Sequence, residues 1–278
     1  MLVLLIRTSK VIYLNHPPYY PTMIEVSIVT PTYNRREFIP ALIQIYRSQT
    51  FPKEKMEWII LDDGRDKVGD LFAEAAKTIP NLRYVTHEEK LRIGAKRNQL
   101  NKEAKGAIII AMDDDDFYPP DRVAHVVKEF KSNPNIELAG SSEMHLWYMD
   151  TQKVHTVGPY HQRHATNGTM AWRKSYSDTH RYNEFVTHGE ESSFLEEYRH
   201  PMIQLTPKKT ILVICHDSNT FDKMKMREEQ QMQTEQATKA SQVSHSSAMR
   251  ESSFSLEHWV KDPSLREFYY NLKHRNRD

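Results

Sequence analysis

The sequence predicts an α/β protein in which helices flank a mainly parallel sheet. Short apolar, β-branched runs alternate along the first half of the chain with longer stretches whose apolar residues recur at helical spacing. Acidic residues follow two of those apolar runs directly. Open α/β sheets bind their ligands beyond the carboxyl ends of the strands, so we expect these acids at a functional edge.

Four strand–helix pairs are predicted in order. The predicted strands cover residues 25–32, 56–61, 82–85 and 107–112, and the predicted helices cover residues 36–48, 67–79, 93–104 and 119–130. Pro31 stops the first strand, and Gly106 opens the fourth. Pro119 starts the last of these helices, as is typical of helix N-termini.

The second half of the chain has a different pattern. We expect a β-hairpin over 144–157, strands over 167–172 and 210–215, and a helix over 190–198. Residues 222–253 are polar, which fits a solvated helix or a disordered linker equally well. Apolar residues return over 254–272, and this segment either docks back onto the domain or contacts a partner or membrane surface.

Composition narrows the class of protein. The net charge of +1 and the absence of a basic stripe argue against a nucleic-acid partner. Cys215 is the only cysteine, so no disulfide forms within the chain, which suits a reducing, cytoplasmic compartment. No apolar run reaches the roughly 20 residues that a transmembrane helix needs.

Acidic residues are concentrated at three predicted element ends: 62–63, 113–116 and 190–191. Any one acidic pair is most simply a helix cap or a solvated turn. Two of the three, however, follow predicted parallel strands. Four consecutive carboxylates, Asp113 to Asp116, repel one another unless a cation neutralises them. A divalent metal ion that carries a diphosphate is the expected neutraliser.

The order of these motifs resembles that of the family 2 glycosyltransferases of the GT-A fold. The resemblance covers residues 24–220 and rests on five segments: 26–35, 59–64, 94–98, 112–116 and 189–195. It implies a GT-A catalytic domain over 23–221. The residues on either side are read from their own composition as an N-terminal extension over 1–22 and a polar linker with an amphipathic C-terminal helix over 222–278.

The resemblance also implies residue roles for the donor. Pro31, Tyr33 and Asn34 would line the nucleotide pocket, and Asp63 would accept a hydrogen bond from the base. The remaining nucleotide-sugar candidates are Arg92, Lys96, Asn98, Asp113 and Asp114. The family pattern needs only alternate acids, so one of Asp114 and Asp116 is free to point into the sheet or to cap the next helix.

The same resemblance implies a metal ligand and a catalytic base. Asp115 would hold Mn²⁺ or Mg²⁺, which stabilises a nucleoside diphosphate leaving group as a Lewis acid. Glu191, beside Glu190, is the candidate catalytic base, although the family more often has aspartate at that position. We expect a helix N-terminus to favour the ionised form of Glu191.

Three further residues have two readings each. His216 is either a late metal ligand or a histidine that is hydrogen-bonded within its turn. Trp172 and His164 are candidates for the acceptor side, with core packing the alternative for Trp172 and plain surface the alternative for His164.

The expected function is therefore metal-dependent, inverting transfer of a sugar from a UDP- or GDP-sugar to a hydroxyl of a glycan, a glycolipid or a protein-linked sugar. A retaining transferase and a catalytically inactive nucleotide- or carbohydrate-binding module are the alternatives. A nucleotidyltransferase ranks lower because residues 30–35 lack glycine. The Gln-x-x-Arg-Trp motif of processive synthases is absent, which favours single additions.

Overall fold

The computed structural model describes residues 10–13, 23–217, 219, 223–225, 227 and 249–272. Most of the predicted N-terminal extension and of the polar linker therefore lies outside the described residues. Within the described part, no helix is both long and apolar enough to cross a membrane.

The large sheet has a parallel centre, as the sequence predicts. Its central strands are β2 (Val26–Thr32), β3 (Met56–Asp62), β4 (Leu82–Thr86) and β5 (Ile108–Ala111), in the order β4-β3-β2-β5. β1 (Lys10–Tyr13) pairs antiparallel with β4 at one edge. On the other side β9 (Ala171–Arg173) runs antiparallel to β5, followed by β6 (Leu138–Gly140) and β10 (Met202–Gln204).

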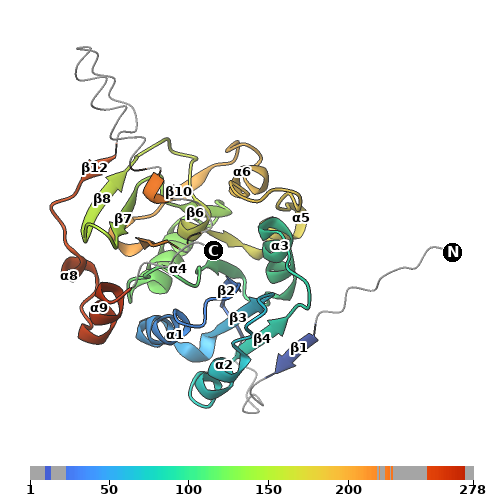
Figure 1. Cartoon of the computed structure of the whole chain (residues 1–278). Coiled ribbons are helices and arrows are strands. Elements are labelled where there is room, and N and C mark those ends of the chain that lie inside the picture. Colours follow the sequence, from blue (N-terminus) through green and yellow to red (C-terminus); the bar gives the residue numbers. More distant parts are fainter. Residues whose placement is uncertain are drawn as a thin grey trace.

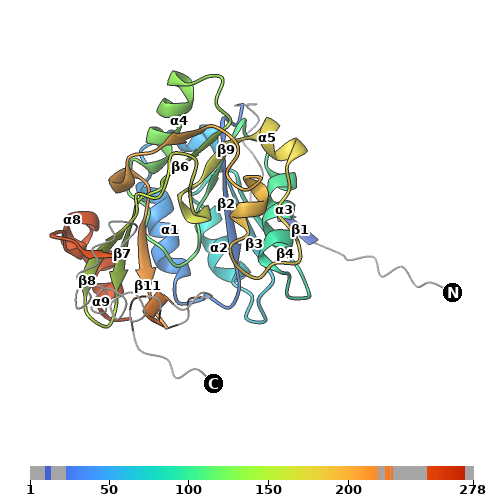
Figure 2. The same ribbon diagram turned by 90° about the horizontal axis from the view of Figure 1, so that it is seen from above.

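Alternating side chains of the central strands build two separate cores. Ile28 and Ile110 point to one face, where they pack with α1 (Ile39–Ser48), α2 (Gly69–Ala76) and α4 (Arg122–Ser132). Val29 and Ile109 point to the other face, toward α3 (Ile93–Glu103), α5 (Lys174–Thr179) and α6 (Glu191–Phe194). Because successive side chains of a strand point to opposite faces of the sheet, helices pack on both faces. Figures 1 and 2 show the resulting layers.

A second, four-stranded sheet lies beside the first. It has the order β11-β7-β8-β12, and its strands are β7 (Met144–Tyr148), β8 (Lys153–Val157), β11 (Leu212–Cys215) and β12 (Arg250–Glu251). β7 and β8 form the predicted hairpin. An isolated antiparallel bridge joins Phe117 to Leu212, so β11 is fixed against the segment that follows the acidic run.

Three short 3₁₀ turns complete the described chain: η1 (Lys53–Lys55), η2 (Asn167–Thr169) and η3 (Pro207–Lys209). Turn η2 takes the place of the first half of the strand predicted over 167–172, so β9 begins only at Ala171. The helix predicted over 119–130 begins at Arg122, because Pro120 disfavours helical geometry at the residue before it.

The helix predicted over 190–198 is also shorter than expected. It ends at Phe194, and Glu196, Glu197 and Tyr198 all adopt left-handed backbone conformations with φ between 47° and 62°. Three consecutive left-handed residues do not continue a right-handed helix.

The C-terminal segment docks onto the domain as two helices instead of the single predicted one. These are α8 (Leu256–Trp259) and α9 (Pro263–Tyr270), which lie beside the small sheet in both views (Figures 1 and 2). The break falls where Asp262 caps a new helix that has Pro263 at its start. Leu256 and Leu265 are buried in the same core as α1. Gln44 of α1 also donates a hydrogen bond to Ser264 (3.0 Å).

We expect Leu256→Ala to lower the free energy of unfolding by about 2–5 kcal/mol, because the side chain is fully buried and its removal leaves a cavity. Denaturant unfolding measures the change. Phe185→Ala, which alters a side chain that is 80% exposed, is the control. Equal stability of the two variants would contradict the docking of α8.

Candidate functional site

The predicted acids gather at one edge of the large sheet. Asp62 ends β3, Asp63 follows it, and residues 113–116 follow β5. β2, β3 and β5 are parallel neighbours, so their carboxyl ends open to the same side.

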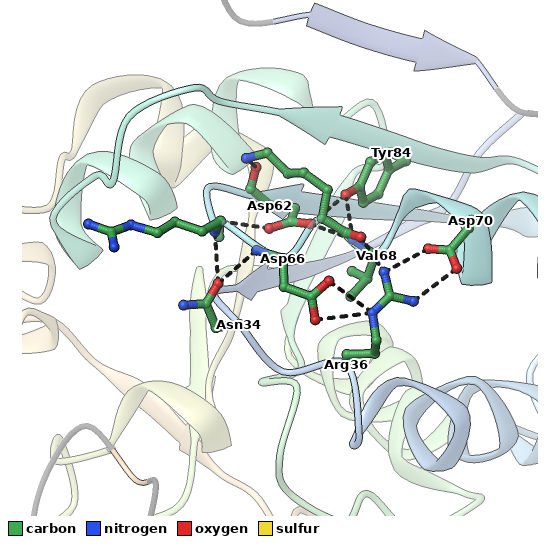
Figure 3. Close-up of polar contacts among 10 residues, drawn as sticks. Asn34, Arg36, Asp62, Asp66, Val68, Asp70 and Tyr84 are labelled. Carbon is green, nitrogen blue, oxygen red and sulfur yellow. Dashed lines mark hydrogen bonds and ion pairs between the residues drawn. The ribbon is translucent and has the colours of Figure 1, made fainter. Parts of the chain in front are cut away.

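Asp62 shapes the loop that leaves β3. Its carboxylate accepts hydrogen bonds from the backbone N–H of Gly64 (2.8 Å) and of Val68 (3.0 Å), and from the Tyr84 hydroxyl (Figure 3). The residue is 0% exposed. A fully buried carboxylate with these three donors is part of the framework of the site.

Asn34 holds the same loop from the side of β2. Its φ of 53° is left-handed, a region that asparagine tolerates better than most residues. Its side-chain oxygen accepts hydrogen bonds from the backbone N–H of Arg65 (2.7 Å) and Asp66 (3.2 Å). Figure 3 also shows Arg36 bound to Asp66 and Asp70 beneath this turn. The predicted nucleotide contact of Asn34 thus coincides with a loop-positioning role.

Asp63 forms a buried ion pair with Lys96 of α3. The Asp63 carboxylate also accepts a hydrogen bond from the Leu91 backbone N–H (2.7 Å), and its side chain is 0% exposed. Lys96 donates to the Thr32 carbonyl as well (3.2 Å). Burial lowers the pKa of Lys96, and the charge of Asp63 opposes that shift. Base recognition by Asp63 therefore requires its neighbours to move.

Two other predicted pocket residues at the end of β2 differ in exposure. Pro31 is buried within β2 and is paired with Leu61, so it supports the edge without facing outward. Tyr33 is half-buried, and the Lys90 ammonium lies 4.2 Å from the centre of its ring.

Each carboxylate of residues 113–116 has a different environment. Asp113 pairs with Arg97 (3.1 Å). Asp115 lies 3.1 Å from the Nε2 atom of His216, which follows β11. Asp116 accepts a hydrogen bond from the Ile214 backbone N–H (2.8 Å), so it is the acid that points into the sheet. Asp114 is nearly buried, and among the described residues its Oδ2 atom is buried without a hydrogen-bond partner.

Arg35 lies close to the central pair of acids. Its Nε atom is 3.9 Å from Asp114 and 3.5 Å from Asp115. Burial and the neighbouring Asp115 raise the pKa of Asp114 to about 8. Burial opposes ionisation of Asp115 too, but His216 and Arg35 outweigh it and hold the pKa of Asp115 well below its usual range. The pair therefore carries an ionised acid beside one that is readily protonated.

Arg97 of α3 connects the acidic run to the third acidic site. It donates to Asp113 through one nitrogen and to Glu190 through Nε (2.8 Å), and it is only 7% exposed. Burial opposes the charge on Arg97, but Asp113 and Glu190 outweigh it and raise its pKa. Glu191 follows directly. Burial raises the pKa of Glu191 to about 7, and the charge of Glu190 adds to the shift.

The start of α6 does favour ionised Glu191 through a backbone hydrogen bond that lowers its pKa, but burial and the charge of Glu190 outweigh this contribution. α6 has only four residues, so its dipole is small, and desolvation of the carboxylate dominates. A raised pKa still suits a base that works near neutral pH.

His216 is hydrogen-bonded within its turn, and its ring points toward the acidic run. Its backbone N–H donates to the Asn219 side chain within the turn (2.8 Å), while its ring faces Asp115 and packs 4.6 Å from the ring of Phe38. The β-bridge between Phe117 and Leu212 holds β11 beside the acidic run, which brings His216 close to Asp115.

Two predicted site residues have structural roles instead. The Asn98 side chain exchanges hydrogen bonds with the backbone of Tyr182 (both 2.9 Å), which leaves it turned toward that segment and not toward a nucleotide. Trp172 is 1% exposed and packs edge-on against Phe194, so it belongs to the core and does not face an acceptor. Its position in β9 puts it on the inner face of the sheet.

Arg92 and His164 lie at the periphery. Arg92 precedes α3, and its guanidinium donates to the carbonyl of Phe185. His164 is half-buried and stacks on Tyr198 with ring centres 4.9 Å apart. Tyr198 belongs to the turn that follows α6, so His164 remains a candidate for the acceptor side.

Sequence reasoning passed over two residues that the structure places in the site, Arg97 and Arg35. Both stand inside the quoted motif segments, at 94–98 and 26–35. Charge balance could have identified both residues. Buried carboxylates need cations nearby, and these arginines are cations within the same motif segments.

We expect Arg97→Met to destabilise the protein by about 3–5 kcal/mol, because it leaves Glu190 buried without its cation. Thermal and denaturant unfolding measure the loss. Arg92→Met, at a guanidinium outside the acidic cluster, is the matched control and should leave stability nearly unchanged. A similar small effect of both variants would contradict a bridging role for Arg97.

Comparison with known proteins identifies the family and the fold of the chain. A family model described as glycosyl transferase family 2 matches residues 27–254. An uncharacterized glycosyltransferase of Haemophilus influenzae is 30% identical over 112 residues, which are 40% of this chain and 36% of that protein. Glycosyltransferase AglE of Haloferax volcanii is 31% identical over 91 residues, 32% of this chain and 30% of that protein. The matches thus span about a third of these relatives.

Two solved structures have the same fold. TarS 1–349 of S. aureus in complex with UDP-GlcNAc superposes with a TM-score of 0.57 at 16% identity, covering 75% of this chain and 65% of that one. Mannosyltransferase PcManGT from Pyrobaculum calidifontis, in complex with GDP-Man and Mn²⁺, gives a TM-score of 0.57 at 15% identity, covering 84% and 67%. The predicted GT-A fold is confirmed. Because the family model spans most of the sequence, the chain belongs to glycosyl transferase family 2.

Proposed function

We propose that this protein transfers a sugar from a UDP- or GDP-sugar to a hydroxyl acceptor, with Mn²⁺ or Mg²⁺ as cofactor. The observation that carries the proposal is the convergence of Asp115 and His216, 3.1 Å apart, next to the orphaned carboxylate oxygen of Asp114. Arg97 ties this edge to Glu190, the neighbour of the candidate base. Arg97 thus links the run that holds the proposed metal ligands to the neighbour of the proposed base.

The side chains at this edge fit a hard dication. Asp115 offers an ionised carboxylate, Asp114 offers an oxygen with no other partner among the described residues, and His216 offers an imidazole nitrogen. Carboxylate oxygens are the ligands that Mg²⁺ and Mn²⁺ prefer. A bound dication would neutralise the diphosphate of the donor and stabilise it as a leaving group.

The donor would lie along the ends of β2, β3 and β5. Asp113 is the most exposed acid of its run, with a side-chain exposure of 23%, and it is our candidate for holding the ribose. The nucleobase of the donor would lie near Tyr33 and the Asp63–Lys96 pair. Two fold neighbours were solved in complex with UDP-GlcNAc and with GDP-Man and Mn²⁺, which supports a nucleotide-sugar donor here.

Glu191 is the proposed general base. It would take the proton from the acceptor hydroxyl as that oxygen attacks the anomeric carbon. The Glu190 carboxylate accepts a hydrogen bond from Arg97, and Glu190 directly precedes α6. This contact therefore holds the backbone next to Glu191 in place. A single displacement inverts the anomeric centre, and the acceptor is a glycan, glycolipid or protein-linked sugar. NMR of the product's anomeric proton separates this outcome from a retaining mechanism.

A donor screen tests the proposal. We expect release of nucleoside diphosphate from one UDP- or GDP-sugar, and we expect added Mn²⁺ to increase it strongly over the chelator-treated protein. Asp115→Ala should abolish turnover and should weaken Mn²⁺-dependent nucleotide binding, measured by calorimetry, because it removes the ionised ligand. Asp178→Ala, at an exposed acid on α5, is the matched control.

Glu191→Gln separates catalysis from binding in the same screen. It should abolish transfer while leaving Mn²⁺-dependent nucleotide affinity within about twofold, since the residue contacts acceptor and not metal. Full activity of this variant would remove Glu191 from the mechanism. Nucleotide binding without any turnover across the screen would favour the inactive binding module instead.

The pH dependence follows from the raised pKa of Glu191. A general base acts only when ionised, so kcat/KM should rise with pH through about 7. Glu190→Gln removes the adjacent negative charge, lowers the pKa of Glu191 and moves the ascending limb to lower pH. Initial rates across the pH range measure both limbs. A limb that stays in place in Glu190→Gln would contradict the coupling.

A further inference from the structure

A second group of metal-ligating side chains lies away from the acidic edge. His180 follows α5, Glu196 stands in the turn after α6, and His200 precedes β10. The three side chains form a cluster, called here the 180–196–200 cluster. Both histidines contact the ring of Tyr176 in α5, which packs in the core on the face of the sheet toward α3, α5 and α6. Residues 113–116 contribute no atom to the cluster.

The cluster has the dimensions of a metal site. One ligand atom from each residue lies within 4.8 Å of the others. The Nε2 atom of His200 is 3.0 Å from Glu196 Oε2, and that of His180 is 3.7 Å from Glu196 Oε1. Zinc bonds of about 2.0–2.2 Å in tetrahedral geometry separate ligand atoms by about 3.4 Å, within this range. The two imidazole planes are nearly perpendicular, at 85°.

The tautomer of His180 presents a lone pair to the cluster. Its Nδ1 atom lies 3.0 Å from the carbonyl oxygen of Tyr176 and 2.9 Å from the hydroxyl oxygen of Thr179. The carbonyl only accepts, and the hydroxyl, which donates to the same carbonyl, can accept as well, so both contacts are satisfied when Nδ1 carries the hydrogen. Nε2 of the neutral ring is then an acceptor that faces the carboxylate of Glu196. Two acceptors in this arrangement need a cation or an added proton between them. Metal-bound histidines typically donate their other N–H to a backbone carbonyl in this way.

Tyr176 supports the orientation further. Its ring stacks on that of His180 with centres 3.9 Å apart and planes 2° from parallel. Its hydroxyl donates to the Phe194 carbonyl at the end of α6 (2.7 Å). The imidazole is thus fixed by packing and by a hydrogen bond before any ligand arrives, which lowers the entropy lost on binding.

We propose that His180, Glu196 and His200 bind one divalent transition-metal ion, with zinc as the best match. Two imidazoles and one carboxylate form a ligand set that suits zinc, and they leave the fourth tetrahedral position to water. Oxygen-preferring Mg²⁺ suits this set less well.

The bound ion would fasten the turn after α6. Glu196, Glu197 and Tyr198 are left-handed, a conformation that the surrounding structure must enforce. The ion would link this turn to α5 and to the start of β10. Tyr198, two residues after the ligand Glu196, stacks on His164, the candidate acceptor-side residue. The site would therefore stabilise the wall of the proposed acceptor region without touching the donor.

Calorimetric titration with zinc chloride tests this site. The full chain carries Asp115→Ala, which removes the ionised ligand of the cation site proposed at the acidic edge, and is stripped of metal with a chelator. We expect one zinc per chain and, with Co²⁺ in its place, the visible absorption of a tetrahedral complex. His200→Ala and Glu196→Gln should each weaken zinc binding by more than about 100-fold. Removing a residue that only orients a metal ligand costs up to about 100-fold, so a greater loss indicates a direct ligand.

His188→Ala is the matched control, since it removes an exposed histidine nearby that is not part of the cluster. It should leave zinc affinity unchanged. Glu196→Gln alters an exposed side chain and preserves its shape, so it decides the outcome if a histidine variant fails to fold. No zinc binding in the Asp115→Ala protein, or equal binding in Glu196→Gln, would overturn the proposal.

Discussion

The architecture of the site depends on the placement of four consecutive carboxylates after a buried strand. Like charges so close together are tolerated when partners or protonation relieve their repulsion. Asp113 takes Arg97, Asp115 takes His216, and Asp116 takes a backbone N–H of β11. These contacts tie α3, β5 and β11 to one point. The requirement to separate the charges therefore also determines where the second sheet joins the first.

Asp114 is the member of the run that the protein leaves least satisfied. Its Oδ2 atom has no partner among the described residues, and Arg35 stands 3.9 Å from its other oxygen, too far for a strong ion pair. The positive charge of Arg35 thus partly offsets the charge of the acids, but its guanidinium lies too far from Asp114 to hold that carboxylate tightly. A dication that arrives with a diphosphate would replace a weak contact, and its binding would convert an unfavourable burial into a ligand bond.

The fold was predictable because the parallel strands are buried on both faces. Ile110 and Ile109 face opposite cores, so strand β5 is apolar without a break and easy to recognise. β6 and β10 have three residues each, too few to show a period, and they went unrecognised. The helix after residue 190 was overestimated, since helical spacing says nothing of the left-handed turn at 196–198.

The acids of the site were predictable from their place after strands, but their surroundings were not. Trp172 shows why: a tryptophan in an apolar run suits a core and a sugar platform equally, and only the register of β9 decides. Glu191 shows the same at the level of charge. A helix start suggests an ionised acid, whereas burial in the folded chain raises its pKa to about 7. A base whose pKa lies near neutrality is a stronger proton acceptor than a solvated carboxylate, so the surroundings that sequence reasoning missed are those that suit Glu191 to its proposed role.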